Sequence, residues 1–384
     1  MIIDTISIVG CVVLILLAVI SVMMNPFFRK VDIEQPIDNN GADNASDLPP
    51  ITVLVMAHNK AKSLDAHLPI ILTQDYAPGY EVVVVGEKGD LQVEAAISQF
   101  AQCKNLYATY VPARSLFMSR AKLCVALGVK AAHNEWIVMI DSESKPISDT
   151  WLLSLAKRMT ANNNLVIGYS NYEPEAPDFY RFNRLVNDCY VYRKAQKSTA
   201  FRANGTNIAF RRSEFIDNDG YRGNLQYVNG EYDFIINKYA RPYSTLTALD
   251  KDATVHEDEP TKKTWHDRNV FYHHIRKHLD RSVGMNLLYN TDSALMHLNY
   301  IAIIMSGTFA AISQRWILLA VAAACLIFTI VCRTLFARRT FEKFDESISL
   351  WKVIPFELSM IWCSLSTCIR YAKSDKADFT THKL

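Results

Sequence analysis

Long apolar runs near both ends of the chain restrict its possible folds more than any other feature. Residues 6–24 and 316–332 are almost entirely apolar, and residues 295–312 are apolar apart from His297, Asn299 and a few small polar residues. A helix of about 19 residues, at ~1.5 Å per residue, spans the ~30 Å of hydrocarbon in a bilayer. Only residues 313–315 join the last two runs, so these runs predict an antiparallel transmembrane hairpin.

Basic residues follow two of these runs and indicate the orientation of the chain. They are Arg29 and Lys30 after the first run, and Arg333, Arg338 and Arg339 after the third. Short basic flanks stay in the cytoplasm. A cleaved signal peptide would instead have a basic start and a small-residue cleavage site, whereas Asp4 precedes the first run. We therefore expect a retained anchor over residues 1–30 in the inner (cytoplasmic) membrane, followed by a polar linker over residues 31–50.

A weaker apolar run lies near the C-terminus. Residues 354–369 carry Glu357, so a fourth span and an interfacial or protein-covered helix are both open, and we expect the second. The sequence thus predicts a membrane hairpin over residues 295–333 and a cytoplasmic or interfacial tail over residues 334–384.

Composition agrees with a domain on the reducing side of a membrane. Hydrophobic residues make up 50% of the chain, and the net charge is only +2, which gives no global sign of nucleic-acid binding. The eight cysteines include no pair with CxxC spacing. We expect buried, reduced thiols rather than a zinc site or a disulfide framework.

Between the membrane runs, short apolar strands alternate with helices. The sequence predicts strands over residues 51–56, 81–85 and 136–140, and helices over residues 61–72, 91–102 and 119–132. The strands show no polar alternation, which is typical of a mostly parallel sheet covered on both faces. Ligands bind beyond the carboxyl ends of the strands in such sheets.

Two acids follow the third of these strands. Asp141 and Glu143, with one residue between them, lie on the predicted loop at its carboxyl end. Carboxylates there suit Mg²⁺ or Mn²⁺ that is shared with diphosphate oxygens. The alternative is an acidic turn or a cap of the helix at Trp151. His256 follows a predicted strand over residues 253–255 and is a candidate third metal ligand or a structural histidine.

Five segments resemble family 2 glycosyltransferases of the GT-A fold, of the membrane-bound bacterial type. In chain order they are ITVLVMAHNKAKSLDAHLPIILTQDY, SRAKLCVALGVKAAHNEWIVMIDSESKP, ANGTNIAFRRSEF, NGEYDFIINKYA and, more loosely, TKKTWHDRNVFYHH. The resemblance covers about residues 50–279. It implies an α/β nucleotide-sugar-binding domain over residues 51–290 with a mixed, mostly parallel central sheet. The C-terminal spans are similar to those of members that make surface polysaccharides or glycolipids.

The resemblance also implies roles for individual residues. Asp141 and Glu143 would hold the metal. The donor would contact His58, Asn59, Glu87, Asp90, Trp265 and Arg268, and the acceptor side would contain Asn204, Gly205 and Asn207. Asp233 or Glu231 would be the catalytic base, with Asp233 preferred because the family's base is an aspartate. Alternatively, these two acids only begin a helix and favour its dipole.

Several positions depart from the family's pattern. Tyr232 stands where the base motif often has an aspartate, Glu143 replaces the second aspartate of the metal motif, and Lys60 stands where a glutamate is frequent. The usual Gln-x-x-Arg-Trp is absent from the sequence, and Trp265 and Arg268 are its loose substitute.

The expected function is transfer of a hexose-type sugar from a nucleoside-diphosphate sugar to a hydroxyl of a lipid-linked or saccharide acceptor, with inversion. The departures leave open a non-catalytic glycosyltransferase-like protein or a membrane scaffold of a polysaccharide assembly system. Basic and aromatic residues are interleaved at Lys262, Lys263, Trp265, Arg268, Phe271, Tyr272, Arg276, Lys277 and Arg281. We expect this cluster to meet donor diphosphate or anionic lipid rather than nucleic acid.

Overall fold

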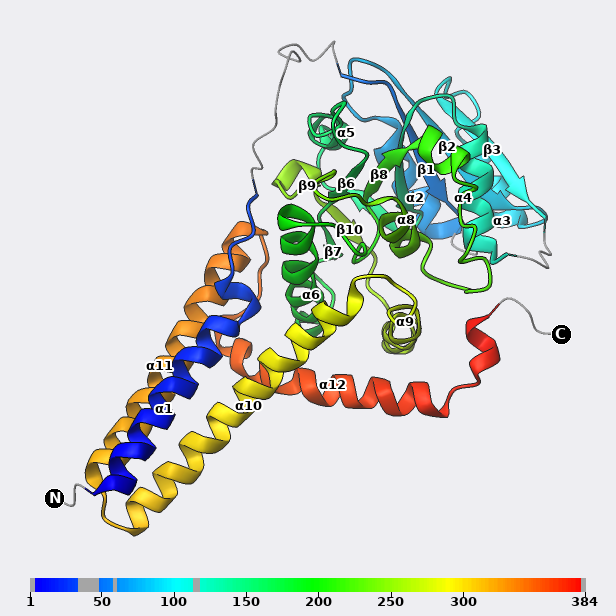
Figure 1. Ribbon diagram of the computed structural model, residues 1–384. Coiled ribbons are helices and arrows are strands. Elements are labelled where there is room, and N and C mark those ends of the chain that lie inside the picture. The colour runs from blue at the N-terminus through cyan, green and yellow to red at the C-terminus, as the bar shows by residue number, and fades with distance from the viewer. Residues whose placement is uncertain (1–3, 34–47, 58–60, 113–117, 381–384) are drawn as a thin grey trace. The chain divides into compact units, whose positions relative to one another are not determined.

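The computed structural model describes residues 4–33, 48–57, 61–112 and 118–380, and it divides into two compact units (Figure 1). The helical unit comprises Met1–Lys30 and Arg281–Ser366, and the globular unit comprises Val31–Asp280 and Thr367–Leu384. Thr367–Leu384 thus group with the globular unit. Most of the expected linker, residues 34–47, lies outside the described residues.

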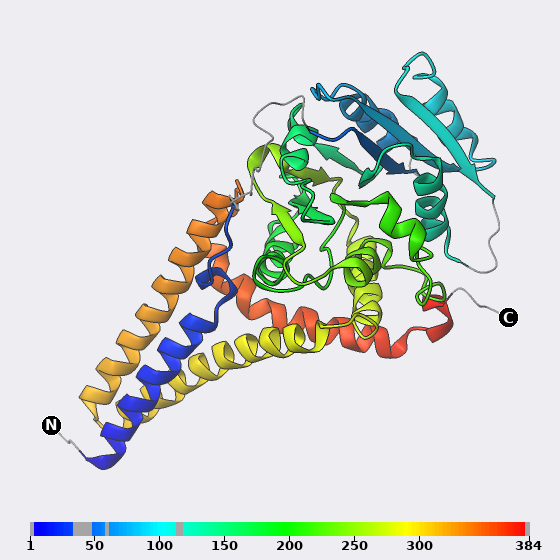
Figure 2. The ribbon, with the colours of Figure 1, turned by 45° about the horizontal axis from the view of Figure 1, so that its top comes forward.

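Three long helices form the helical unit. They are α1 (Thr5–Met24), α10 (Ser282–Ile312) and α11 (Trp316–Lys343), and they run alongside one another in both views (Figures 1 and 2). Their shared core contains Leu14, Ile303 and Leu318, while other large apolar side chains face outward. A turn at residues 313–315, with Gln314 at φ 52°, joins the expected hairpin.

The fourth apolar helix is α12 (Val353–Lys373), preceded by a short turn of 3₁₀ helix, η4 (Leu350–Lys352). It leaves the bundle of α1 and α11 at a steep angle in both views (Figures 1 and 2). Within the described part of the chain, four helices are long and apolar enough to cross a membrane by length and composition: α1, α10, α11 and the helix over Leu350–Lys373.

A buried ion pair joins the start of α12 to the bundle. The Arg333 side chain is only 1% exposed, and its Nε donates to Glu357 Oε2 at 2.7 Å. Its Nη1 donates to the carbonyl oxygen of Ser21 in α1 at 2.8 Å. Asn25 Nδ2 donates to the other oxygen of Glu357 at 2.8 Å. The acid that made residues 354–369 a weak apolar run is therefore the partner of a buried guanidinium.

Removing the charge of Glu357 is expected to destabilise the helical unit. Glu357→Gln leaves the buried Arg333 with only Asp292, at 3.7 Å, as a charged partner among the described residues, and breaking a buried pair in this way costs about 3 kcal/mol. Glu342→Gln is the matched control, because it breaks the exposed pair of Glu342 with Arg338 on the same helix, which contributes about 0.5 kcal/mol or less. Thermal unfolding in detergent measures both, and equal losses would contradict this role of Glu357.

The globular unit is built on a seven-stranded sheet with the order β3-β2-β1-β4-β8-β6-β9. The strands are β1 (Ile51–Met56), β2 (Tyr80–Glu87), β3 (Leu106–Val111), β4 (Trp136–Asp141), β6 (Leu165–Gly168), β8 (Ile208–Arg211) and β9 (Thr245–Ala248). The first four strands are parallel, while β8 is antiparallel to both of its neighbours. The expected mixed, mostly parallel sheet is confirmed.

Helices cover both faces of this sheet, as the unbroken apolar strands predict. The helices of the globular unit are α2 (Ala61–Leu72), α3 (Leu91–Ser98), α4 (Arg120–Ala131), α5 (Trp151–Ala156), α6 (Asp178–Lys197), α7 (Arg212–Asp217), α8 (Glu231–Tyr239) and α9 (Lys262–Ile275). Val53 and Val55 of β1 pack on the side of α2, α3 and α5. Leu54 faces α4, where a Cβ on Gly128 would come within 2.2 Å of the Leu54 side chain.

A second, three-stranded sheet has the order β5-β10-β7. Its strands are β5 (Ser144–Pro146), β7 (Ser170–Tyr172) and β10 (Val255–Glu257). The strand expected over residues 253–255 therefore begins two residues later, and His256 lies inside it rather than after it. Since β5 follows β4 directly, this sheet brings Glu257 close to the carboxyl end of β4.

Candidate active site

One cavity of about 320 Å³ lies beside the carboxyl end of β4. Four acids line it, namely Asp141, Glu231, Asp233 and Glu257, together with the arginines Arg184, Arg202 and Arg268. Its aromatic lining includes Tyr172, Tyr180, Tyr232, Trp265, Phe271 and Tyr272. The position matches the expectation that chemistry lies beyond the strand ends.

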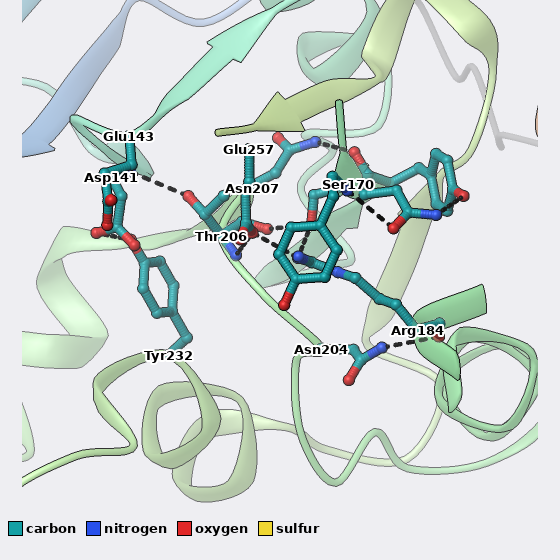
Figure 3. A network of polar contacts seen from close by, with 12 residues as sticks. Asp141, Glu143, Ser170, Arg184, Asn204, Thr206, Asn207, Tyr232 and Glu257 are labelled. Carbon is teal, nitrogen blue, oxygen red and sulfur yellow. Dashed lines mark hydrogen bonds and ion pairs between the residues drawn. The ribbon is translucent and has the colours of Figure 1, made fainter. Parts of the chain in front are cut away.

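Asp141, the last residue of β4, is held in place by two hydrogen bonds (Figure 3). Its backbone N–H donates to Thr206 Oγ1 at 3.1 Å, and its Oδ1 accepts a hydrogen bond from the Tyr232 hydroxyl at 2.7 Å. Burial raises the pKa of Asp141 to about 7, and the bond from Tyr232 offsets only part of this shift. Glu231 and Glu257 raise the pKa further, so the site disfavours one more negative charge.

A chain of ion pairs crosses the cavity wall from α6 to the loop after β4. Arg184 Nη2 lies 2.5 Å from Glu257 Oε1, and Arg268 Nη1 lies 3.2 Å from Glu257 Oε2. Arg268 Nη2 in turn lies 3.4 Å from Glu143 Oε2. Burial alone would raise the pKa of Glu257, but the two arginines, Arg184 above all, lower it to about 2. In Figure 3, Glu257 lies between Arg184 on one side and Asp141 on the other.

The first turn of α8 supplies the remaining acids. Gly230 precedes it in the left-handed region, at φ 92°, where glycine is favoured. Glu231, Tyr232 and Asp233 follow, and all three line the cavity. Burial raises the pKa of Asp233 to about 6 and also raises that of Glu231. These acids therefore begin a helix and also line the cavity.

The acceptor-side segment divides between the cavity and the core. Asn204 and Gly205 line the cavity, and Gly205 has a φ of 151°. Asn207 is completely buried: its Oδ1 accepts from Trp151 Nε1 at 3.1 Å, and its Nδ2 donates to the carbonyl oxygens of Tyr169 and Ala253, each at 2.9 Å. Both ends of its amide are thus bonded to other buried residues, so the structure gives Asn207 a supporting position.

Several other predicted residues lie away from the cavity lining. Glu87 pairs with Arg120 at 2.8 Å, and Asp90 Oδ1 caps α3 by accepting from the N–H of Val93. Both lie at the carboxyl end of β2, on the same edge of the sheet as Asp141. His58 and Asn59 lie outside the described residues.

His256, the candidate third metal ligand, is not among the residues that line the cavity. Alternate residues of a strand point to opposite faces, and it is Glu257 that lines the cavity. His256 is paired in register with Lys145 of β5. In the described part of the chain, no group of three His, Cys, Asp or Glu side chains is arranged to hold a metal.

Trp265 and Arg268 of α9 reach the cavity as expected. Trp265 is only 4% exposed and stacks on Tyr180, with ring centroids 4.2 Å apart and planes within 9°. Sequence reasoning missed Arg184, Arg202 and Glu257. The alternation of side chains along β10 was the one signal that could have indicated Glu257. No local motif could have indicated the two arginines, because they reach the cavity through tertiary packing.

No family model matches this sequence, and no curated protein matches it in sequence. In structure, the chain resembles the mannosyltransferase PcManGT from Pyrobaculum calidifontis in complex with GDP-Man and Mn²⁺, at 16% identity with a TM-score of 0.55, over 95% of this chain and 99% of that one. It also matches S. aureus TarS 1-349 in complex with UDP-GlcNAc, at 12% identity with a TM-score of 0.42, over 85% of this chain and 93% of that one. The first likeness shows that the chain shares the fold of that mannosyltransferase.

The position of Gly205 beside Arg184 predicts a severe effect of Gly205→Ala. A Cβ at Gly205 would lie 1.7 Å from Arg184 Nη2, so the guanidinium would have to leave Glu257, and breaking this buried pair costs about 3 kcal/mol. Gly223→Ala is the control, because Gly223 also has a positive φ, 96°, but no described atom lies within 4 Å of the place that its new methyl group would take. There we expect about 1–2 kcal/mol from the backbone alone. Thermal unfolding of both variants measures the difference, and equal losses would show that the contact with Arg184 relaxes without cost.

Proposed function

We propose that this protein is a membrane-bound, metal-dependent, inverting glycosyltransferase. It moves a hexose-type sugar from a nucleoside-diphosphate sugar to a hydroxyl of a lipid-linked or saccharide acceptor. The observation that carries the proposal is the cavity that Asp141, at the carboxyl end of β4, shares with Glu231 and Asp233. The fold shared with a mannosyltransferase in complex with GDP-Man and Mn²⁺ supports it.

Asp141 and Glu143 suit a divalent cation. Carboxylate oxygens are the ligands that Mg²⁺ and Mn²⁺ prefer, and the raised pKa of Asp141, with Glu231 and Glu257 nearby, marks a place where added positive charge is favourable. Such a cation would neutralise the charge that builds on a leaving diphosphate. Donor oxygens would complete its coordination, because His256 stays on the other face of β10.

Donor contacts follow from the same arrangement. Arg268 and Trp265 line the cavity, and they are proposed to contact the donor. Glu87 and Asp90 are candidates for the nucleoside, because they lie at the carboxyl end of the neighbouring strand β2.

Asp233 suits the base better than Glu231 does. Glu231 raises the pKa of Asp141 and also that of Asp233. The charged neighbour that most affects Asp233 is Arg202, which lowers its pKa. With a pKa of about 6, Asp233 is mostly ionised at neutral pH and still accepts a proton readily. Tyr232, between them, positions Asp141 through its hydroxyl.

The helical unit would anchor the enzyme in the cytoplasmic membrane, with the catalytic domain in the cytoplasm. The outward apolar side chains of α1, α10 and α11 suit lipid. The steep departure of α12 from these helices favours a position in the interface. Trp351 and Trp362, exposed at 75% and 70%, are side chains that concentrate at that depth.

One observation favours a non-catalytic alternative. The Tyr232 hydroxyl occupies an oxygen of Asp141, at the position where the related family often has an aspartate. A protein that binds a sugar nucleotide without transferring the sugar would retain donor affinity and show no turnover with any acceptor.

The metal assignment predicts that Asp141→Asn removes Mn²⁺-dependent donor binding. The change keeps the size of the side chain and removes one negative ligand, so affinity for a nucleoside-diphosphate sugar should fall about 10-fold or more. Asp219→Asn is the control, because Asp219 is exposed and pairs with the surface residue Arg222. Calorimetric titration of a panel of nucleoside-diphosphate sugars, with and without Mn²⁺, measures this. Unchanged metal-dependent binding by Asp141→Asn would place the metal elsewhere.

The base assignment predicts that Asp233→Asn lowers turnover by about 10²–10⁴-fold while donor binding is kept. In the parent protein, turnover should rise with pH through about 6, because Asp233 must be ionised to accept the proton and its pKa is raised to about 6. Steady-state rates between pH 5 and 8 measure both effects. If Glu231→Gln alone removes turnover, Glu231 is the base; full turnover in both variants would mean that the two acids only begin α8.

A further inference from the structure

Arg202 is a buried arginine that makes no ion pair with any described residue. It lines the cavity and is only 4% exposed. In the described chain, no carboxylate lies within ion-pair distance of it, whereas Arg184 and Arg268 are both paired with Glu257. Its one hydrogen bond within that part of the protein runs from Nη2 to Asn204 Oδ1 at 2.6 Å. Most of its five N–H donors are therefore unused by the described protein.

A charge left in this state calls for an anionic ligand. Arginine stays protonated in proteins, so burial cannot neutralise it as it neutralises a lysine or a carboxylic acid. Burying a charge without a partner is strongly unfavourable. The buried Nε of Arg202 has no hydrogen-bond partner in the described structure. A ligand with a phosphate or a carboxylate would supply the missing acceptors in a forked geometry that guanidinium suits.

The surroundings of Arg202 place such a ligand on the acceptor side. The guanidinium lies over the ring of Tyr272, 3.9 Å from its centroid, and Asn204 holds one end. Arg202 and Asp233 both line the cavity, and Arg202 lowers the pKa of Asp233 and also that of the buried Asp188. The guanidinium therefore shares the cavity with the proposed base, beside Asn204 of the expected acceptor side.

We infer that the acceptor is an anionic molecule, carrying a phosphate or a carboxylate near its attacking hydroxyl, and that Arg202 binds this anionic group. The inference rests on the proposed transferase function. The acceptor oxygen forms a bond to the anomeric carbon while the sugar–diphosphate bond breaks. The hydroxyl proton passes to Asp233, and the electron pair leaves with the diphosphate. Arg202 fixes the acceptor so that its hydroxyl lies beside Asp233, and it selects against neutral acceptors.

Two matched pairs of probes test this inference. Glycerol 3-phosphate is compared with glycerol, and methyl glucuronide with methyl glucoside, by ligand-observed NMR titration of the full-length protein in detergent with nucleoside diphosphate and Mn²⁺ present. Charge-assisted hydrogen bonds of this kind correspond to about 10- to 100-fold in affinity. We expect the charged member of one pair to bind that much more tightly. The pair that responds distinguishes phosphate from carboxylate.

Variants assign the preference to Arg202. Arg202→Gln should abolish it, Arg202→Lys should retain part of it, and Arg222→Gln should keep it, because Arg222 is an exposed arginine outside the cavity. Thermal unfolding confirms that each variant is folded, and Arg202→Lys carries the test if Arg202→Gln does not fold. Equal binding within both pairs, or a preference that survives both Arg202 variants, would overturn the inference.

Donor binding separates the two proposals. If the charge of Arg202 serves the donor instead, Arg202→Gln will weaken nucleoside-diphosphate binding, and this outcome also overturns the inference. If the parent protein binds no nucleoside-diphosphate sugar at all, the proposed function itself fails. Normal donor binding without a preference for anionic acceptors leaves the proposed function standing and removes only this inference.

Discussion

The pairing of Glu257 with two arginines is the interaction on which the cavity depends. Glu257 comes from β10, Arg184 from α6 and Arg268 from α9, so one carboxylate joins three elements that are distant in sequence. Each of these charges would be costly to bury alone, and each satisfies another. Since Arg268 also reaches Glu143, the same chain of charges ends at the loop after β4. Ion pairs therefore join the walls of the cavity, in addition to the packing of its aromatic side chains.

This arrangement divides nearby carboxylates into different roles. Glu257 is so strongly paired that its pKa falls to about 2, and it serves as a fixed negative charge. Asp141 and Asp233 are half-buried and make no ion pair with any described residue, and desolvation raises their pKa values to about 7 and about 6. Environments that separate the pKa values of neighbouring acids also separate their functions. Binding a cation would offset the cost of the negative charge on Asp141, and accepting a proton would offset it on Asp233.

Much of the fold was predictable because it follows from local patterns. The strand and helix over Ile51–Met56 and Ala61–Leu72 lie where the sequence predicted them, since continuous apolar strands and amphipathic helices have distinct periods. The edge strand over Leu106–Val111 was missed, because its half-buried residues carry no continuous apolar run.

The candidate site was predicted only in part. Asp141 follows a recognisable strand, whereas Arg184 and Arg202 reach the cavity through tertiary packing, which the local sequence does not encode. The prediction for His256 depended on the bounds of one short strand. That strand begins two residues later than predicted, and Glu257 rather than His256 lines the cavity.

A structure of the protein with a nucleoside-diphosphate sugar and Mn²⁺ would test the central claim most directly. The account predicts the diphosphate and the metal beside Asp141 and Glu143, with the anomeric carbon of the sugar directed into the cavity toward Asp233. The carboxylate of Glu257 should keep both of its arginines. A donor bound at another place in the globular unit, or a metal bound without Asp141, would contradict the account.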